Sequence, residues 1–141
     1  MARADFYLIG KPRFREQPLL LVCELARKAV HSNQPLLVLA ASREQAEALD
    51  DLLWSFDPDD YLPHQIAGID LDEEEADVLI VPPEIDASMR PLVLNLRDAP
   101  VPGNFERVLE VVPADESARG SSRERWKHYK ERGVEVSKHD M

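Results

Sequence analysis

A cluster of basic residues around one tryptophan is the part of the sequence best suited to bind a ligand. Positions 119–132 hold six Arg or Lys residues and two Glu residues, a net charge of +4 in a chain whose formal net charge is -10. On a helix, one face would carry these residues: Arg123, Trp126, Lys127 and Lys130. Arg119 joins that face if the helix begins early enough. Cations beside an aromatic ring suit a small acidic ligand, because they offer charge for its carboxylates and an apolar wall for its hydrophobic part.

The ends of this basic segment have helix-capping residues. Ser121 with Glu124 predicts a capping box, and Gly133 predicts the end of the helix. A second interpretation stays open, in which the helix is simply solvated and its Trp126 and Tyr129 pack into the core.

Composition restricts the classes of function. A chain of 141 residues with one cysteine predicts one domain, no internal disulfide, no multi-cysteine zinc site and a reduced, cytoplasmic compartment. The net charge of -10 argues against direct, non-specific binding to DNA or to an anionic membrane. No apolar run approaches the ~20 residues of a membrane span, and the first residues do not resemble a signal peptide. Nothing indicates a homo-oligomer, so a monomer or heterodimer is expected.

Short apolar runs alternate with amphipathic segments along the chain. Strands are predicted over residues 5–9, 36–40, 78–81, 92–96 and 107–112, with a short edge strand over 134–136 before a polar tail. Helices are predicted from Pro18 to about Ser32, from a Ser42–Gln45 capping box to about Trp54, and over the basic segment. This alternation predicts a single α/β domain of three layers, with a mainly parallel sheet flanked by helices in a Rossmann-like topology.

The segment 55–70 is predicted to be a loop with an unusual apolar content. It contains Phe56, Tyr61, Leu62, Pro63 and Ile66. Such a loop either marks a partner site or folds back onto the core, and both alternatives stay open. The same loop carries His64, which we expect to be a surface residue. The acidic run Asp70–Asp77 lacks metal-site spacing and predicts a solvated turn.

The sequence lacks the motifs of enzymes that use this kind of fold. None of its five glycines forms a phosphate-binding G-x-G-x-x-G or Walker motif, and no histidine has a partner at zinc spacing. Cys23 lies on the apolar face of its helix and is expected to be an inert core thiol. We therefore predict a binding module without catalytic residues, cofactor or metal.

Five short motifs together resemble one protein family. They are FYL at Phe6–Leu8, VCE at Val22–Glu24, L-D-x-x-L-W at Leu49–Trp54, [FY]-[LV]-P-H-x-x-A-G at Tyr61–Gly68 and R-E-R-[WY]-K-x-Y at Arg123–Tyr129. They span nearly the whole chain, which resembles the chi subunit of bacterial DNA polymerase III. The acidic run near position 70 and Gly120 depart from the family pattern.

The resemblance implies a non-catalytic accessory subunit of the clamp-loader complex in DNA replication. Such a protein binds the psi subunit and the acidic, hydrophobic C-terminal tail of the single-stranded DNA-binding protein. By matching positions, the tail site would comprise Arg119, Arg123, Trp126, Lys127 and Trp54. The psi surface, which a helicase partner would share, would comprise Tyr61, Leu62 and Pro63.

Two alternatives belong to other classes. The first is a nucleotide-using α/β enzyme, for which the sequence shows no phosphate-binding loop. The second is a degenerate relative or a partner of a helicase, because the strand and helix of residues 34–54 resemble part of a RecA-like domain.

Overall fold

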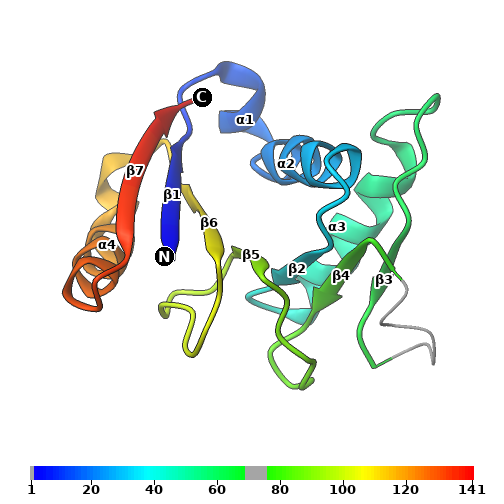
Figure 1. The fold of residues 1–141 in the computed structure, drawn as a ribbon. Coiled ribbons are helices and arrows are strands. Elements are labelled where there is room, and N and C mark those ends of the chain that lie inside the picture. Colours follow the sequence, from blue (N-terminus) through cyan, green and yellow to red (C-terminus); the bar gives the residue numbers. More distant parts are fainter. Residues whose placement is uncertain (1, 69–75) are drawn as a thin grey trace.

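Seven strands form one parallel sheet in the computed structural model, which describes residues 2–68 and 76–141 (Figure 1). The strand order is β3-β4-β2-β5-β6-β1-β7, and every neighbouring pair runs parallel. The strands are β1 (Arg3–Leu8), β2 (Leu36–Leu39), β3 (His64–Ile66), β4 (Val78–Val81), β5 (Leu92–Asn95), β6 (Arg107–Val112) and β7 (Glu135–Asp140). The predicted α/β class is confirmed.

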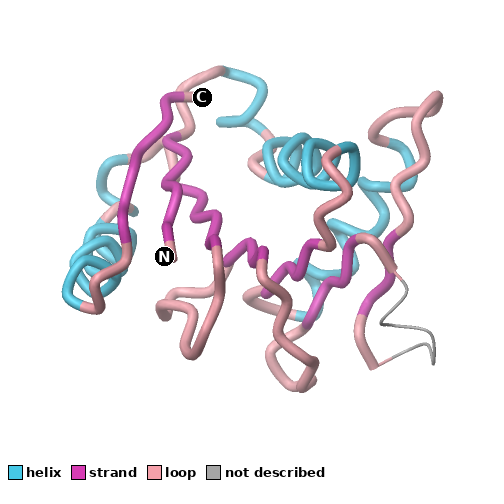
Figure 2. The backbone as a smooth tube through the Cα atoms, viewed as in Figure 1, coloured by secondary structure: helices cyan, strands magenta, loops and turns pink. Residues whose placement is uncertain are grey.

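Helices cover both faces of the sheet (Figure 2). They are α1 (Pro12–Glu16), α2 (Leu19–His31), α3 (Arg43–Ser55) and α4 (Gly120–Glu131), with a 3-10 turn η2 (Glu116–Ala118) before α4. Alternate residues of β2 point to opposite faces, so Val38 packs with α2 and α3 while Leu37 belongs to the core that includes Tyr129 of α4. Because β2 is buried on both faces, all of its residues are apolar, which explains the continuous apolar run in the sequence. No helix of the described residues is long and apolar enough to cross a bilayer.

The structure confirms two of the predicted helix ends and contradicts a third. The Ser42 side chain accepts a hydrogen bond from Gln45 N at 3.0 Å, which confirms the cap of α3. Gly133 has a φ of 80°, as expected at the end of α4. The capping box at Ser121 is wrong, because α4 already begins at Gly120 and Ser121 lies inside the helix.

Three elements differ from the sequence-based expectation. Helix α1 was not predicted, and β3 lies where a loop was expected, because a three-residue strand gives no detectable period. His64 of β3 is buried, so its predicted surface position is wrong. Strand β7 has six residues and extends through the tail, because it pairs with β1 along its whole length despite its polar sequence. The acidic run falls mainly in residues 69–75, outside the described residues.

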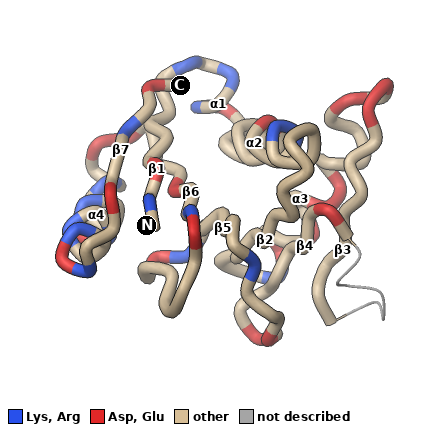
Figure 3. The backbone as a smooth tube through the Cα atoms, in the orientation of Figure 1, with Lys and Arg blue, Asp and Glu red and all other residues tan. Residues whose placement is uncertain are grey.

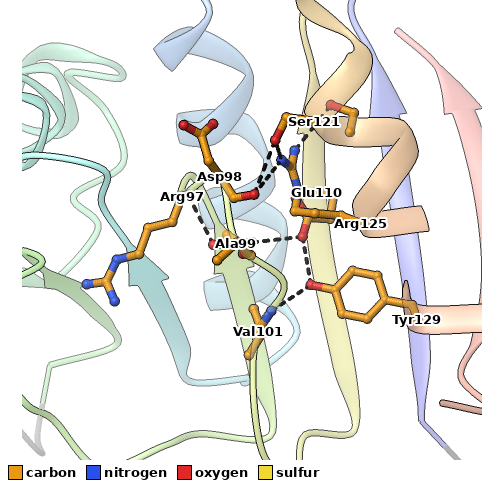
Figure 4. A network of polar contacts seen from close by, with 10 residues as sticks. Arg97, Asp98, Ala99, Val101, Glu110, Ser121, Arg125 and Tyr129 are labelled. Carbon is orange, nitrogen blue, oxygen red and sulfur yellow. Dashed lines mark hydrogen bonds and ion pairs between the residues drawn. The ribbon is translucent and has the colours of Figure 1, made fainter. Parts of the chain in front are cut away.

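A buried ion pair joins α4 to the middle of β6 (Figure 4). Glu110 is fully buried and accepts hydrogen bonds from Arg125 Nε at 2.9 Å, Tyr129 Oη at 2.8 Å and Asn95 Nδ2 at 2.8 Å. Tyr129 Oη in turn accepts from Val101 N at 2.9 Å. Burial raises the pKa of Glu110, and the cation and the three donors oppose this shift.

A second buried carboxylate joins β1 to both of its neighbouring strands. Asp5 accepts hydrogen bonds from Arg3, from Arg107 of β6 at 2.6 Å and from His139 of β7 at 2.8 Å. Burial alone would raise the pKa of Asp5, but the hydrogen bonds from Arg3, His139 and Arg107 outweigh it and lower the pKa to about 2.

We predict that Glu110→Gln lowers the free energy of unfolding by about 3–5 kcal/mol, because it leaves the buried Arg125 without a countercharge. Urea unfolding followed by circular dichroism measures this loss. Glu106→Gln is the matched control, because Glu106 is exposed just before β6 and should change little. A loss below about 1 kcal/mol for Glu110→Gln would show that the ion pair does not secure α4.

The shifted pKa of Asp5 predicts acid-sensitive stability. The pKa in the folded chain, about 2, lies below the unfolded value of about 3.9, so ionised Asp5 stabilises the fold above about pH 4 and this contribution is lost as the pH falls toward 2. The stability difference between wild type and Asp5→Asn should therefore shrink between about pH 4 and about pH 2. Urea unfolding at a series of pH values tests this, with the exposed Asp59→Asn as control. A difference that does not depend on pH in this range contradicts the expectation.

Candidate protein-binding sites

A pocket of about 400 Å³ lies between α4 and the β1–β7 edge of the sheet. Its apolar floor comprises Phe6, Leu8, Val112 and Trp126. Its cationic rim comprises Arg119, Arg123, Lys127 and Lys138. We call these eight residues, together with Ser122, the α4 pocket. An apolar floor with four cations around it fits a ligand that is both hydrophobic and acidic.

The face of α4 that points into the core fixes the side chains of the pocket. Ser122, Arg125 and Tyr129 are buried at i, i+3 and i+7, so the adjacent face turns toward the rim. Trp126 is half-buried, with its ring centroid 5.0 Å from that of Phe6 at an interplanar angle of 60°. The sequence left open whether Trp126 and Tyr129 both pack into the core or whether Trp126 is available to a ligand. In the structure Tyr129 is a core residue, whereas Trp126 lines the pocket.

The rim cations are held to different degrees. Arg119 donates from Nε to the Pro113 carbonyl at 2.8 Å, which fixes it at the start of α4. Arg123 pairs with Glu116 at 3.3 Å, but both side chains are exposed and such pairs contribute little. Within the described residues, Lys127 and Lys138 form no ion pair. Most of the cationic charge is thus available to a ligand.

The structure brings together four of the five residues expected at the tail site: Arg119, Arg123, Trp126 and Lys127. The fifth, Trp54, does not line this pocket. It lies on α3, beside β3 at the opposite edge of the sheet, and so is separated from the other four residues. Lys138 was missed because it follows the short strand that the sequence predicts. Only the pairing of β7 with β1 brings it to the rim.

Trp54 instead forms an exposed aromatic pair with Tyr61. Their ring centroids lie 5.2 Å apart at an interplanar angle of 24°, and the two residues are 60% and 58% exposed. The ring of His64 packs edge-on beneath Trp54, at 4.9 Å. We call Trp54 and Tyr61 the aromatic surface. Two large apolar rings stacked in solvent are characteristic of a protein-binding site.

Part of the apolar loop folds back onto the core, and part of it stays exposed. Leu62 is only 1% exposed and belongs to the core, so its side chain is not accessible beside Tyr61 and Pro63. Ile66 is also buried, and Phe56 packs against the same core. Pro63 is half-buried, and Tyr61 is the residue of this loop that presents an aromatic ring to solvent. The side chains that anchor the loop thus alternate with those that remain accessible.

A larger cavity of about 760 Å³ lies at the carboxyl ends of β1, β5 and β6, where open α/β sheets bind ligands. Three arginines and three acidic residues line it, so it has no excess of charge for phosphate groups. Two of the arginines are already engaged, Arg97 by backbone carbonyls and Arg125 by Glu110.

No group of three metal-binding side chains occurs within the described residues. Burial raises the pKa of Cys23 to about 12, so this thiol does not ionise readily to a nucleophile.

The rim of the α4 pocket predicts how an acidic peptide ending in phenylalanine would respond to mutation. Lys138→Glu should weaken its binding about tenfold, because one attraction becomes a repulsion at the rim. Trp54→Ala should leave it unchanged, because Trp54 lies at the other edge. Fluorescence anisotropy of a labelled peptide measures both. An equal loss of peptide affinity in Trp54→Ala would mean that the peptide contacts both edges of the sheet.

Comparisons with known proteins agree with this architecture. The family model of the DNA polymerase III chi subunit, HolC, matches residues 1–137. The DNA polymerase III subunit chi of Pseudomonas aeruginosa is 35% identical over 146 residues, covering 100% of this chain and 98% of that protein. The subunit chi of Escherichia coli is 29% identical, covering 83% and 81%.

Among solved structures, the C-terminal domain of the DEAD-box protein Dbp5 is similar, with a TM-score of 0.66 and 12% identity, covering 99% of this chain and 90% of that one. This likeness concerns the fold alone. The family match over nearly the whole chain and the full-length relative show that the chain belongs to the family of DNA polymerase III chi subunits.

Proposed function

We propose that this chain is a non-catalytic clamp-loader subunit that connects the psi subunit to the C-terminal tail of the single-stranded DNA-binding protein. Family membership identifies it as an accessory subunit of DNA polymerase III in DNA replication. The observation that carries the bridging role is the pair of accessible surfaces at opposite edges of one sheet. Two partners at these surfaces would not compete for the same residues.

The α4 pocket has the chemistry that an acidic tail ending in phenylalanine requires. Arg123 and Lys127 would receive carboxylates, and the phenyl ring would pack on Trp126. Each charge-assisted hydrogen bond contributes ~1.5–3 kcal/mol, but an open rim loses much of this gain to water. We therefore expect a micromolar dissociation constant that rises with salt.

The aromatic surface is the proposed contact for psi. Trp54 joins Tyr61 in this role, and Pro63 extends it, whereas Leu62 acts from the core by supporting the loop. Aromatic rings near the centre of an interface typically contribute most of the binding energy. A helicase partner could use the same rings in place of psi, which makes these two partners mutually exclusive.

A titration of a fluorescent tail peptide tests the first half of the proposal. The wild-type chain should bind the peptide with micromolar affinity, and raising NaCl from about 50 to about 300 mM should weaken binding severalfold. The double substitution Arg123→Glu/Trp126→Ala should abolish binding, because it removes both a rim cation and part of the apolar floor. An affinity that does not change with salt would refute the electrostatic account.

The reciprocal variant serves as the control. Tyr61→Ala should weaken psi binding at least tenfold and leave tail binding unchanged, because its ring is exposed at the other edge. Arg123→Glu/Trp126→Ala should show the opposite pattern. Loss of both partners in either variant, with a lowered melting temperature, would indicate misfolding instead of two sites.

A further inference from the structure

We propose that the aromatic surface binds a cationic segment of its partner, in which Arg or Lys side chains flank at least one apolar side chain. This inference rests on the proposed function of that surface and specifies the chemistry of the partner. The cations would pair with carboxylates that surround Trp54 and Tyr61, and the apolar side chain would pack on the two rings.

The chain around the aromatic surface is strongly acidic (Figure 3). Residues 43–61 contain seven acidic side chains and one basic side chain. The acids are Glu44, Glu47, Asp50, Asp51, Asp57, Asp59 and Asp60. The one base, Arg43, is already paired with Glu84 at 2.7 Å. The local field at this edge therefore favours a cation.

Helical spacing places two of these carboxylates beside the exposed ring. Asp51 precedes Trp54 by three residues on α3, and Asp50 precedes it by four, so both are its neighbours on the helix surface. The Asp50 carboxylate lies 3.2 Å from His64 Nε2 and is partly engaged there. Asp51 is exposed and forms no ion pair within the described residues. It is the carboxylate best placed to receive a partner's cation.

The loop that carries Tyr61 contributes a second available carboxylate. Asp57 pairs with Arg27 at 3.2 Å, and Asp60 pairs with His31 at 2.6 Å. Asp59, between them, is exposed and forms no ion pair within the described residues. The surface thus has carboxylates that are engaged by its own chain and others that remain open.

The rings themselves also favour a cation. The faces of Trp and Tyr carry a negative quadrupole, and indole is the best of these acceptors for a guanidinium. Beneath them, His64 Nδ1 lies 2.6 Å from the Leu62 carbonyl, and its Nε2 faces the Asp50 carboxylate at 3.2 Å. The exposed ring faces and the carboxylates of Asp51 and Asp59, unpaired within the described residues, together indicate a surface that favours a cation.

The opposite charges of the two edges would also keep each partner from binding at the other partner's surface. The α4 pocket has four cations at its rim, whereas the aromatic surface is surrounded by acids. An acidic tail is repelled from the aromatic surface, and a cationic segment is repelled from the α4 pocket. Charge would therefore select the edge at which each partner docks before close packing begins.

The test uses a fluorescent peptide of alternating arginine and leucine, with an arginine–glycine peptide and a glutamate–leucine peptide as comparison probes. The arginine–leucine peptide should bind the wild type most tightly of the three. Trp54→Ala and Asp51→Lys should each weaken it about tenfold. Glu131→Lys is the matched control, because it makes the same charge change on an exposed residue at the end of α4.

The outcomes separate a specific site from general attraction to an acidic protein. Equal weakening by Glu131→Lys and Asp51→Lys, or no effect of Trp54→Ala, would overturn the inference. Thermal melts of the three variants, which alter exposed side chains, establish that they remain folded. Self-association of the wild type that is lost in Asp51→Lys would assign this surface to the basic edge of a second copy, and would also overturn it.

Binding of psi to the same variants distinguishes this inference from the proposed function. If psi binds the wild type, is lost in Tyr61→Ala and is unaffected by Asp51→Lys or by salt, the cationic segment is refuted and the proposed function stands. If psi does not bind while the arginine–leucine peptide binds through Trp54 and Asp51, the inference stands and the psi assignment is removed.

Discussion

The ion pair between Glu110 and Arg125 determines how α4 sits on the sheet. Both side chains are buried, and Arg125 Nε on the inner face of the helix lies 2.9 Å from Glu110 Oε1 in the middle of β6. Two charges taken out of water are costly unless they meet each other with good geometry. Asn95 and Tyr129 also donate hydrogen bonds to the Glu110 carboxylate. All of these bonds can form together in only one rotation of α4 about its axis.

That rotation creates the α4 pocket. With Arg125 and Tyr129 inside, the neighbouring face bearing Arg123 and Trp126 is directed toward Phe6 and β7. The pocket is therefore a by-product of how the helix is buried. Asp5 plays the corresponding role in the sheet, since its hydrogen bonds hold β6, β1 and β7 together and so keep Lys138 at the rim.

The parallel topology keeps the two candidate surfaces apart. β3 and β7 are the two edge strands of the sheet, with five strands between them. One edge presents cations around an apolar floor, and the other presents stacked rings in an acidic environment. A sheet covered on both faces can only offer such surfaces at its edges or at the ends of its strands, because its faces are occupied by helices and loops.

The sequence predicted much of the fold and some of the residues that the structure brings together on each candidate surface. Apolar runs and caps located β2, β4, β5, α2 and α3, because these signals are local. They did not reveal β3, which is too short to show a period, or the full length of β7, whose polar residues become a strand only beside β1. The glutamate within the apolar run of β6 was a detectable signal, because a charge in a buried strand requires a partner.

What the sequence determined by itself was the α/β class, the family and the face of α4 where cations flank a tryptophan. Only the tertiary structure decided which side chains from distant segments complete each surface. It placed Trp54 beside Tyr61 and outside the α4 pocket, buried Leu62 and Arg125 in the core, and brought Lys138 to the pocket. The physical reason is that periodicity fixes which residues share a face of one element, whereas burial and strand pairing decide what lies against that face.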